Sequence, residues 1–278
     1  MQKGSSVEPL SLTPTKMFVR MTLKNYSNWI PPLVALFCLL LVWELSVRFL
    51  ALPSIILPSP LAIAATTLKI VPTIWYHIFT TAFEALVGLF CAVVIALASA
   101  LFMDMVPLAK KAIYPLIVIS QTVPIIYLAP LFILWFGFGI FPKIVVVVLV
   151  CFFPIVIALA DSLNNVDEKR LLLMRTLGAT KIQTMFFLKL PATLPSFFSA
   201  LKIAATYSIM GAVIGEWLGG EAGLGVYIIR VKQSFSIEKV FAGILIITIL
   251  SLIIFRLIQT IERLCLPYLN IQNIMEKK

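Results

Sequence analysis

The sequence predicts an all-α, polytopic membrane protein with six transmembrane helices. Of its 278 residues, 61% are hydrophobic and only 12% are charged, and the mean hydropathy is +1.07. A soluble domain carries about 25% charged residues. A helix needs roughly 20 apolar residues to cross the hydrocarbon layer, and the chain has enough such stretches for six crossings. We expect them at about residues 30–50, 78–103, 113–136, 144–160, 196–217 and 240–261.

The first two predicted spans each carry an acidic residue. Glu44 in the first span lies one helical turn before Arg48, so we expect an ion pair near the outer surface. Glu84 lies six positions into the second span. Burying a charge in lipid without compensation is costly, which makes Glu84 a functional candidate. Its position near the outer end also allows partial hydration, and both interpretations remain open.

The middle spans differ in proline content. The third contains Pro115, Pro124 and Pro130. Prolines are tolerated in membrane helices when neighbouring groups satisfy the freed carbonyls. We therefore expect one kinked helix, which would suit a wall that opens or reflect irregular packing. The fourth span, "IVVVVLVCFFPIVIALA", has no charged residue.

The last two spans enclose a glycine-rich segment. Lys202 in the fifth span can extend to the inner interface. "GEWLGGEAGLG" at its end permits tight turns and close backbone approach, and no strand precedes it as a nucleotide-binding loop would require. The following stretch, 226–239, carries Arg230 and Lys232. It is interpreted as an outer gate, a docking surface or a plain re-entrant loop.

The distribution of basic residues predicts the orientation. If the N-terminus is inside, 15 of the 22 lysine and arginine residues fall in inner segments and five, Lys143 among them, in outer segments. Because inner loops of membrane proteins are enriched in basic residues, both termini are expected to be cytoplasmic. The net charge of +10 then fits lipid-facing basic residues and does not indicate nucleic acid as a partner.

The inner loop 161–195 is predicted to form two short helices. "NVDE" suggests Asn165 as the N-cap of a helix over about 166–177, with Glu168 completing a capping box. Gly178 supplies a left-handed stop.

The second helix of this loop begins with another capping box, at Thr180 and Gln183. It is expected to end near Lys189, before Pro191. Part of the apolar surface of the two helices remains unpaired. It would lie on the membrane as an interfacial helix or in the groove of a soluble partner.

This loop resembles the coupling loop of binding-protein-dependent ABC importer permeases, in which a glycine is followed about ten residues later by an aliphatic residue and Leu-Pro. The corresponding residues are Gly178, Leu188, Leu190 and Pro191. The family often has Glu-Ala-Ala before the glycine, whereas this chain has Leu-Leu-Met at 172–174. A salt bridge from that acid is therefore not carried over.

Four further blocks extend the resemblance over nearly the whole chain. They are similar to the subgroup that imports nitrate, taurine, alkanesulfonates and pyrimidine precursors of thiamine. The segment over 215–255 is most similar to the pyrimidine-precursor branch. The blocks are "LPSPLAIAATTLK" (57–69), "PLFILWFGFG" (130–139), "LPATLPSFFSALKIA" (190–204) and "GAVIGEWLGGEAGLG" (211–225).

The resemblance implies a type I ABC importer permease fold in a bacterial plasma membrane. It implies a second copy of the chain, an ABC ATPase subunit dimer and an extracytoplasmic solute-binding protein as partners. The chain has no Gly-x-x-x-x-Gly-Lys-Ser/Thr motif, so it is not expected to be an enzyme. No cofactor is expected on this chain, and ATP and Mg would be bound by the partner ATPase.

Two other functions fit the sequence less well than the permease. A stand-alone secondary transporter or channel would more often show two repeated halves with interrupted helices. An intramembrane enzyme would need a nucleophile and a base at depth, for which one histidine, His77, is poor material.

The predicted domains are a cytoplasmic segment 1–29, a first helix with an outer segment 30–77, a core 78–262 with the coupling loop 161–195, and a cytoplasmic tail 263–278. The predicted ATPase-coupling residues are Arg175, Leu177, Gly178, Ala179, Thr180, Leu188, Leu190 and Pro191. The candidates for the solute path or an outer gate are Glu84, Glu216, Gly219, Gly220, Gly223 and Gly225. No metal site is predicted.

Overall fold

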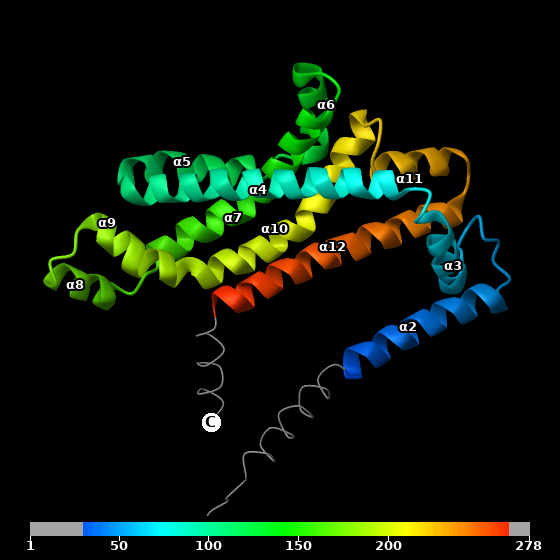
Figure 1. The fold of residues 1–278 in the computed structure, drawn as a ribbon, viewed down its shortest axis with the longest axis horizontal. Coiled ribbons are helices and arrows are strands. Elements are labelled where there is room, and N and C mark those ends of the chain that lie inside the picture. Colours follow the sequence, from blue (N-terminus) through cyan, green and yellow to red (C-terminus); the bar gives the residue numbers. More distant parts are fainter. Residues whose placement is uncertain (1–29, 267–278) are drawn as a thin grey trace, which may run out of the picture. The chain divides into compact units, whose positions relative to one another are not determined.

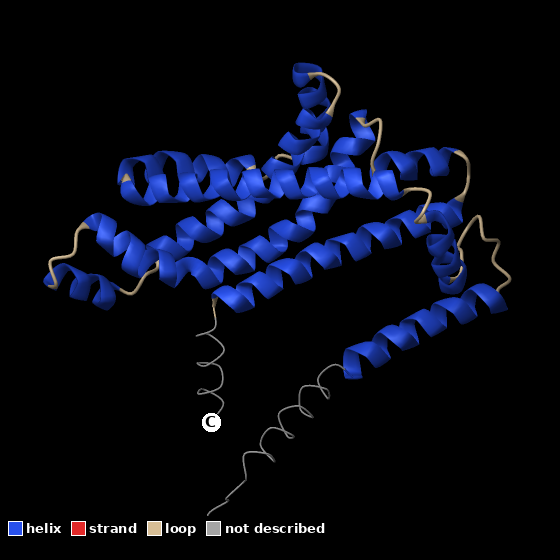
Figure 2. Ribbon diagram, in the orientation of Figure 1, coloured by secondary structure: helices blue, strands red, loops and turns tan. Residues whose placement is uncertain are grey.

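The structure is a computed structural model that describes residues 30–266, and within that range every regular element is a helix (Figures 1 and 2). The predicted segment 1–29 and the end of the predicted tail, 267–278, lie outside the described residues. The chain divides into two compact units, residues 1–63 and 64–278.

The first unit contains α2 (Ile30–Phe49) and the start of α3 (Pro60–Ile70). The expected pair between Glu44 and Arg48 is confirmed, with Arg48 Nε 2.7 Å from Glu44 Oε1. The other carboxylate oxygen accepts the backbone N–H of Leu61 at 3.2 Å. Glu44 therefore satisfies one of the free N–H groups in the first turn of α3.

The second unit is built on four long helices, α4 (Trp75–Met105), α7 (Ile140–Asn164), α10 (Leu190–Gly219) and α12 (Ile237–Cys265) (Figure 1). The tightest packing joins α7 to α4 and α10. A Cβ atom added at Gly88 would lie 2.5 Å from Val147 Cβ, and one at Gly211 would lie 3.2 Å from Val147 Cα. Small residues thus let two helix backbones approach α7 closely, as in many membrane bundles.

The third predicted span is broken, not merely kinked. It consists of α5 (Pro107–Ser120) and α6 (Ile125–Phe136), whose axes differ by 101°. The break is at Pro124, which adopts an extended conformation (ψ 118°) before α6, whereas Pro115 and Pro130 lie inside continuous helices. Proline disfavours the helical conformation of the residue before it, so it ends one helix and begins the next.

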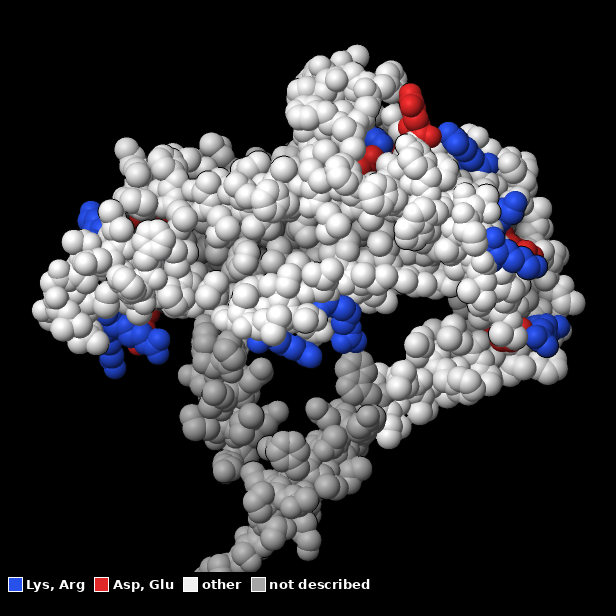
Figure 3. All heavy atoms as spheres, viewed as in Figure 1, with Lys and Arg blue, Asp and Glu red and all other residues white. Residues whose placement is uncertain are grey.

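Within the described residues, five helices are long and apolar enough to span a membrane, or six if the bent pair forms one span. This agrees with the six predicted crossings. Neutral side chains cover most of the face seen in Figure 3, and charged side chains occur in small groups. Apolar side chains such as Phe90 (70% exposed) and Leu252 (56% exposed) are available to contact lipid.

Candidate functional site

Two regions contain the predicted site residues. The first is the elbow, which we define as residues 168–184. It comprises α8 (Glu168–Thr176) and α9 (Lys181–Thr184). Asn165 is not the N-cap of α8, contrary to the sequence prediction. Its backbone N–H donates to the carbonyls that end α7, and the chain turns through Val166 to Asp167, whose side chain caps α8 by accepting the Lys169 N–H at 2.9 Å.

The bend between these helices follows the prediction. Gly178 has φ of +74°, the left-handed conformation that glycine adopts without strain. Its N–H donates to Arg175 O, and the N–H of Ala179 donates to Met174 O, both at 3.0 Å. Thr180 then forms a complete capping box with Gln183. The elbow is therefore fixed by local hydrogen bonds on both sides of the glycine.

The second helix does not end near Lys189, contrary to the prediction. It continues through a π-helical turn, η1 (Met185–Lys189), directly into α10. The N–H of Leu190 donates to Met185 O, five residues back. Pro191 cannot donate an N–H, and the wider turn places this proline in the first turn of α10 without ending the helix. The result is one apolar helix over Lys181–Gly219, 39 residues long.

The remaining coupling residues occupy different environments around the elbow. Arg175 and Ala179 line a cavity of about 370 Å³ beneath it. At the edge of this cavity, Lys189 Nζ lies 2.8 Å from both carboxylate oxygens of Asp104 at the end of α4. Leu177 is 72% exposed, whereas Leu190 packs against the main core. Other exposed apolar side chains of the elbow are Leu172, Leu173 and Ile182.

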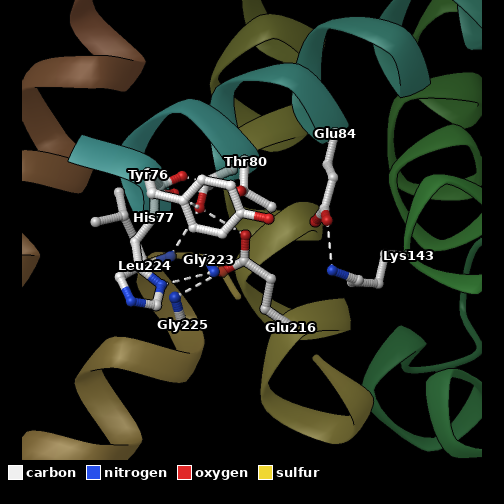
Figure 4. Close-up of polar contacts among 10 residues, drawn as sticks. Tyr76, His77, Thr80, Glu84, Lys143, Glu216, Gly223, Leu224 and Gly225 are labelled. Atoms are coloured by element: carbon white, nitrogen blue, oxygen red, sulfur yellow. Dashed lines mark hydrogen bonds and ion pairs between the residues drawn. The ribbon is translucent and has the colours of Figure 1, made fainter. Parts of the chain in front are cut away.

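The second region is a buried polar cluster between α4, α10 and α11 (Leu224–Gln233) (Figure 4). Glu216 is 1% exposed and Thr81 is fully buried. One Glu216 oxygen accepts the Thr81 hydroxyl at 2.5 Å, and the other accepts the Gly225 N–H at 2.6 Å. The Thr81 oxygen also accepts the Leu224 N–H at 2.8 Å. The first turn of α11 is thus tied to two spanning helices.

Two glycines of the cluster are required by this close approach. Gly223 has φ of +123°, and a Cβ atom there would lie 2.1 Å from the Glu216 carboxyl carbon. Its N–H donates to His77 Nδ1 at 3.0 Å. A Cβ atom at Gly225 would lie 2.7 Å from Val213 O. The glycine-rich sequence therefore allows the backbone to contact a buried carboxylate.

The structure adds a residue that the sequence analysis placed in an outer segment. Lys143 lies in the first turn of α7, is 6% exposed, and forms an ion pair with Glu84, which is fully buried (Figure 4). The interpretation of Glu84 as partly hydrated is therefore wrong. Because α7 begins at Ile140, four residues before the predicted start, the lysine falls inside the helix. Glu84 was the sequence signal that could have identified Lys143, because an acid inside an apolar span needs a basic or polar partner.

The structure brings most of the predicted path or gate residues together. Gly219 and Gly220 lie at the end of α10, where added Cβ atoms would lie 2.6 Å from Ile133 and 2.7 Å from Val226. Lys143 interacts electrostatically with Glu216 as well as with Glu84. The arrangement joins five helices, α4, α6, α7, α10 and α11. Its participation in a solute path stays a prediction.

Comparison with known proteins identifies the family. The model of the binding-protein-dependent transport system inner membrane component family matches residues 86–265. The chain is 37% identical over 247 residues to the formylaminopyrimidine transport permease ThiX of Halalkalibacterium halodurans, covering 88% of this chain and 98% of that protein.

More distant relatives have other substrates in their names. The riboflavin transport system permease RibX of Chloroflexus aurantiacus is 29% identical, covering 83% of this chain and 87% of the relative. The taurine transport system permease TauC of Escherichia coli is 26% identical, covering 81% and 82%.

Among solved structures, the chain is similar to the inward-facing methionine ABC transporter MetNI. The TM-score is 0.59 at 19% identity, and the match covers 69% of this chain and 97% of that one. This similarity supports the type I importer permease fold, and the named relatives are transport permeases, not enzymes. The resemblance inferred from the sequence is confirmed: the chain is a multi-pass protein of the bacterial plasma membrane and belongs to the binding-protein-dependent inner membrane components, the permeases of ABC importers.

Proposed function

We propose that this permease imports a pyrimidine precursor of thiamine. The observation that carries the proposal is its 37% identity to the formylaminopyrimidine permease over 98% of that protein, against 26% to the taurine permease. The riboflavin permease, at 29%, lies between them. A formylaminopyrimidine and riboflavin are both uncharged nitrogen heterocycles, whereas sulfonates and nitrate are anions.

The elbow is proposed to couple transport to a separate ATPase. Its exposed leucines offer an apolar surface to a soluble partner. Since α9, η1 and α10 form one helix, a force on the elbow would reach the buried polar cluster at the far end of α10 without crossing a flexible joint. In this proposal, two ATPase subunits hold ATP and Mg, a second copy of the chain completes the path, and a solute-binding protein delivers the solute from outside.

Reconstitution tests the substrate and the need for a separate ATPase. Proteoliposomes would contain this chain, its ATPase subunit and its solute-binding protein, with ATP on the ATPase side. We expect ATP-dependent accumulation of labelled formylaminopyrimidine and none of an aliphatic sulfonate or nitrate. Matched vesicles without the ATPase should not accumulate it. Preferential sulfonate uptake would overturn the substrate, and accumulation without the ATPase would favour a stand-alone transporter.

A further inference from the structure

An open groove lies between α7 and α10, in the halves of these helices nearer the elbow. Its volume is about 580 Å³, and it extends along α7 from Pro154 to Asn165. At 1.5 Å per residue, this corresponds to roughly 16 Å along the helix axis. The groove is therefore large enough for a solute with one or two rings.

The lining of the groove is polar at the elbow-side ends of the two helices. Asp161 and Ser162 line it from the last turn of α7, Asn165 lines it just after that helix, and Ser196 and Ser199 line it from α10. Asp161, Ser162 and Asn165 fall in the predicted inner loop 161–195, next to the cytoplasm, whereas Ser196 and Ser199 fall at the start of the fifth predicted span, where lipid could not satisfy a hydroxyl group. This face of the two helices is therefore expected to border water or another protein surface.

The charge of the groove is negative. Among the described residues, Asp161 is the one charged residue that lines it, and no lysine or arginine does. Asp161 Oδ1 accepts the Tyr114 hydroxyl at 2.7 Å, and within residues 30–266 the carboxylate forms no ion pair. It lies in the last turn of α7, where the helix dipole adds partial negative charge. A cleft lined by one sign of charge concentrates its field and excludes ions of the same sign.

We propose that this groove is the elbow-side half of the solute path, and that it admits neutral or cationic hydrogen-bonding solutes and disfavours anions. The inference rests on the proposed permease function and adds the charge class of the solute and a residue that sets it. The hydroxyl groups and the amide supply donors and acceptors for a heterocycle. Asp161 supplies the discrimination against a sulfonate.

The test measures entry into the groove without measuring transport. Ser199→Cys is placed in a variant whose four native cysteines are replaced, and the assembled transporter is studied in inside-out vesicles. The cysteine is treated with a cationic and an anionic methanethiosulfonate of similar size. Each rate is divided by the rate of the same reagent with a small free thiol, because the reacting thiolate is an anion and favours a cationic reagent by itself. We expect this normalised rate to be roughly threefold to tenfold higher for the cationic reagent, as one nearby unit charge in a partly hydrated site would cause.

Two controls accompany this measurement. Asp161→Asn removes the charge and keeps an oxygen that can accept the Tyr114 hydroxyl, so the ratio of the two normalised rates should fall close to one. Leu252→Cys, at an apolar exposed position on α12, should remain unmodified by both reagents.

Several outcomes would overturn the inference. If neither reagent modifies Ser199→Cys in the assembled transporter, the groove is covered and is not a path. Equal rates before and after Asp161→Asn would refute the charge selection. Because the rates do not depend on uptake, a wrong substrate assignment in the reconstitution assay leaves them unchanged, and the two failures are distinguishable.

Discussion

At the scale of single residues, Glu216 shows how a buried carboxylate can be kept inside a membrane protein. One of its oxygens accepts the Thr81 hydroxyl and the other accepts the Gly225 N–H, while the Leu224 N–H donates to the Thr81 oxygen. Backbone can reach the carboxylate only because Gly223 and Gly225 lack side chains. Substitution of these glycines should therefore cost stability through geometry, not through lost charge.

Gly223→Ala should destabilise the protein far more than Gly178→Ala does. Both glycines have positive φ, and the strain of an alanine there is roughly 1–3 kcal/mol. At Gly178 an added Cβ meets nothing within 4 Å, whereas at Gly223 it would meet the Glu216 carboxylate. The overlap should add about 1–3 kcal/mol. Thermal unfolding of the purified variants in detergent measures the difference, and equal losses would show that the contact is easily relieved.

A second prediction concerns the ion pair between Glu84 and Lys143. Removing one partner of a buried pair typically costs about 3–5 kcal/mol, because the other charge is left unpaired. Lys143→Met should cost more than Glu84→Gln, since Lys143 also interacts with Glu216. The double variant should lose less than the sum of the two single losses. Thermal unfolding of the unmodified chain, the two single variants and the double variant gives a double-mutant cycle. Strictly additive losses of stability would contradict a direct pairing.

The sequence indicated part of this cluster. Glu84 and Glu216 can be recognised in the sequence because acids are rare in apolar runs. The glycines can be recognised because they are closely spaced in "GEWLGGEAGLG". Lys143 was assigned to an outer segment because hydropathy alone cannot place the first turn of a helix. Its burial depends on Glu84, 59 residues earlier, and on Gly215, where an added Cβ would lie 3.1 Å from Lys143 Cα. Such pairing depends on how helices that are distant in the sequence pack together.

At the scale of elements, the helix boundaries at Gly178 and Thr180 are as predicted, whereas those at Asn165 and Pro191 are not. The Thr180 capping box depends only on residues three apart, and it formed as predicted. The capping role of Asn165 failed because α7 continues to Asn164 and takes this residue as its own C-terminal cap. Pro191 predicted a helix end, but a π-helical turn accommodates it. Whether a proline breaks a membrane helix depends on neighbouring helices that the sequence does not reveal.

The elbow should tolerate asparagine but not valine at position 178. Gly178→Val places a β-branched residue at φ of +74°, a conformation that asparagine adopts far more readily. The strain of roughly 1–3 kcal/mol should reorient α8 relative to α9. We expect ATP-dependent uptake to fall about tenfold or more with valine and to change little with asparagine.

Both variants should reach the membrane in normal amounts, as immunoblotting of membrane fractions would show, because α8 and α9 make few contacts with the main core. Equal uptake by the valine variant and the unmodified chain would argue against a coupling role for the bend. Equal loss of uptake in both variants would show that any side chain at position 178 impairs coupling, whichever backbone conformation it allows.

At the scale of the whole molecule, hydropathy predicted the number of crossings because a chain in lipid must satisfy its own backbone, which leaves helices as the solution. It did not predict which helices touch. The contact of α7 with α4 and α10 relies on Gly88 and Gly211 facing Val147, and isolated glycines in apolar runs carry no such information by themselves. The orientation in the membrane rests on the charge bias and is open to direct measurement.

The elbow and the end of α11 should lie on opposite sides of the membrane. Between them, α10 is 30 residues long, or about 45 Å, which exceeds the roughly 30 Å of the hydrocarbon layer. In a background without native cysteines, Thr176→Cys and Ser234→Cys place small thiols at exposed positions. An impermeant thiol reagent should label Thr176→Cys only in inside-out vesicles and Ser234→Cys only from the outer face of intact membranes, with detergent-treated samples giving the total. Labelling of both from one side would contradict a single crossing by α10, and exchanged sides would place the elbow outside, where no ATP-hydrolysing subunit could engage it.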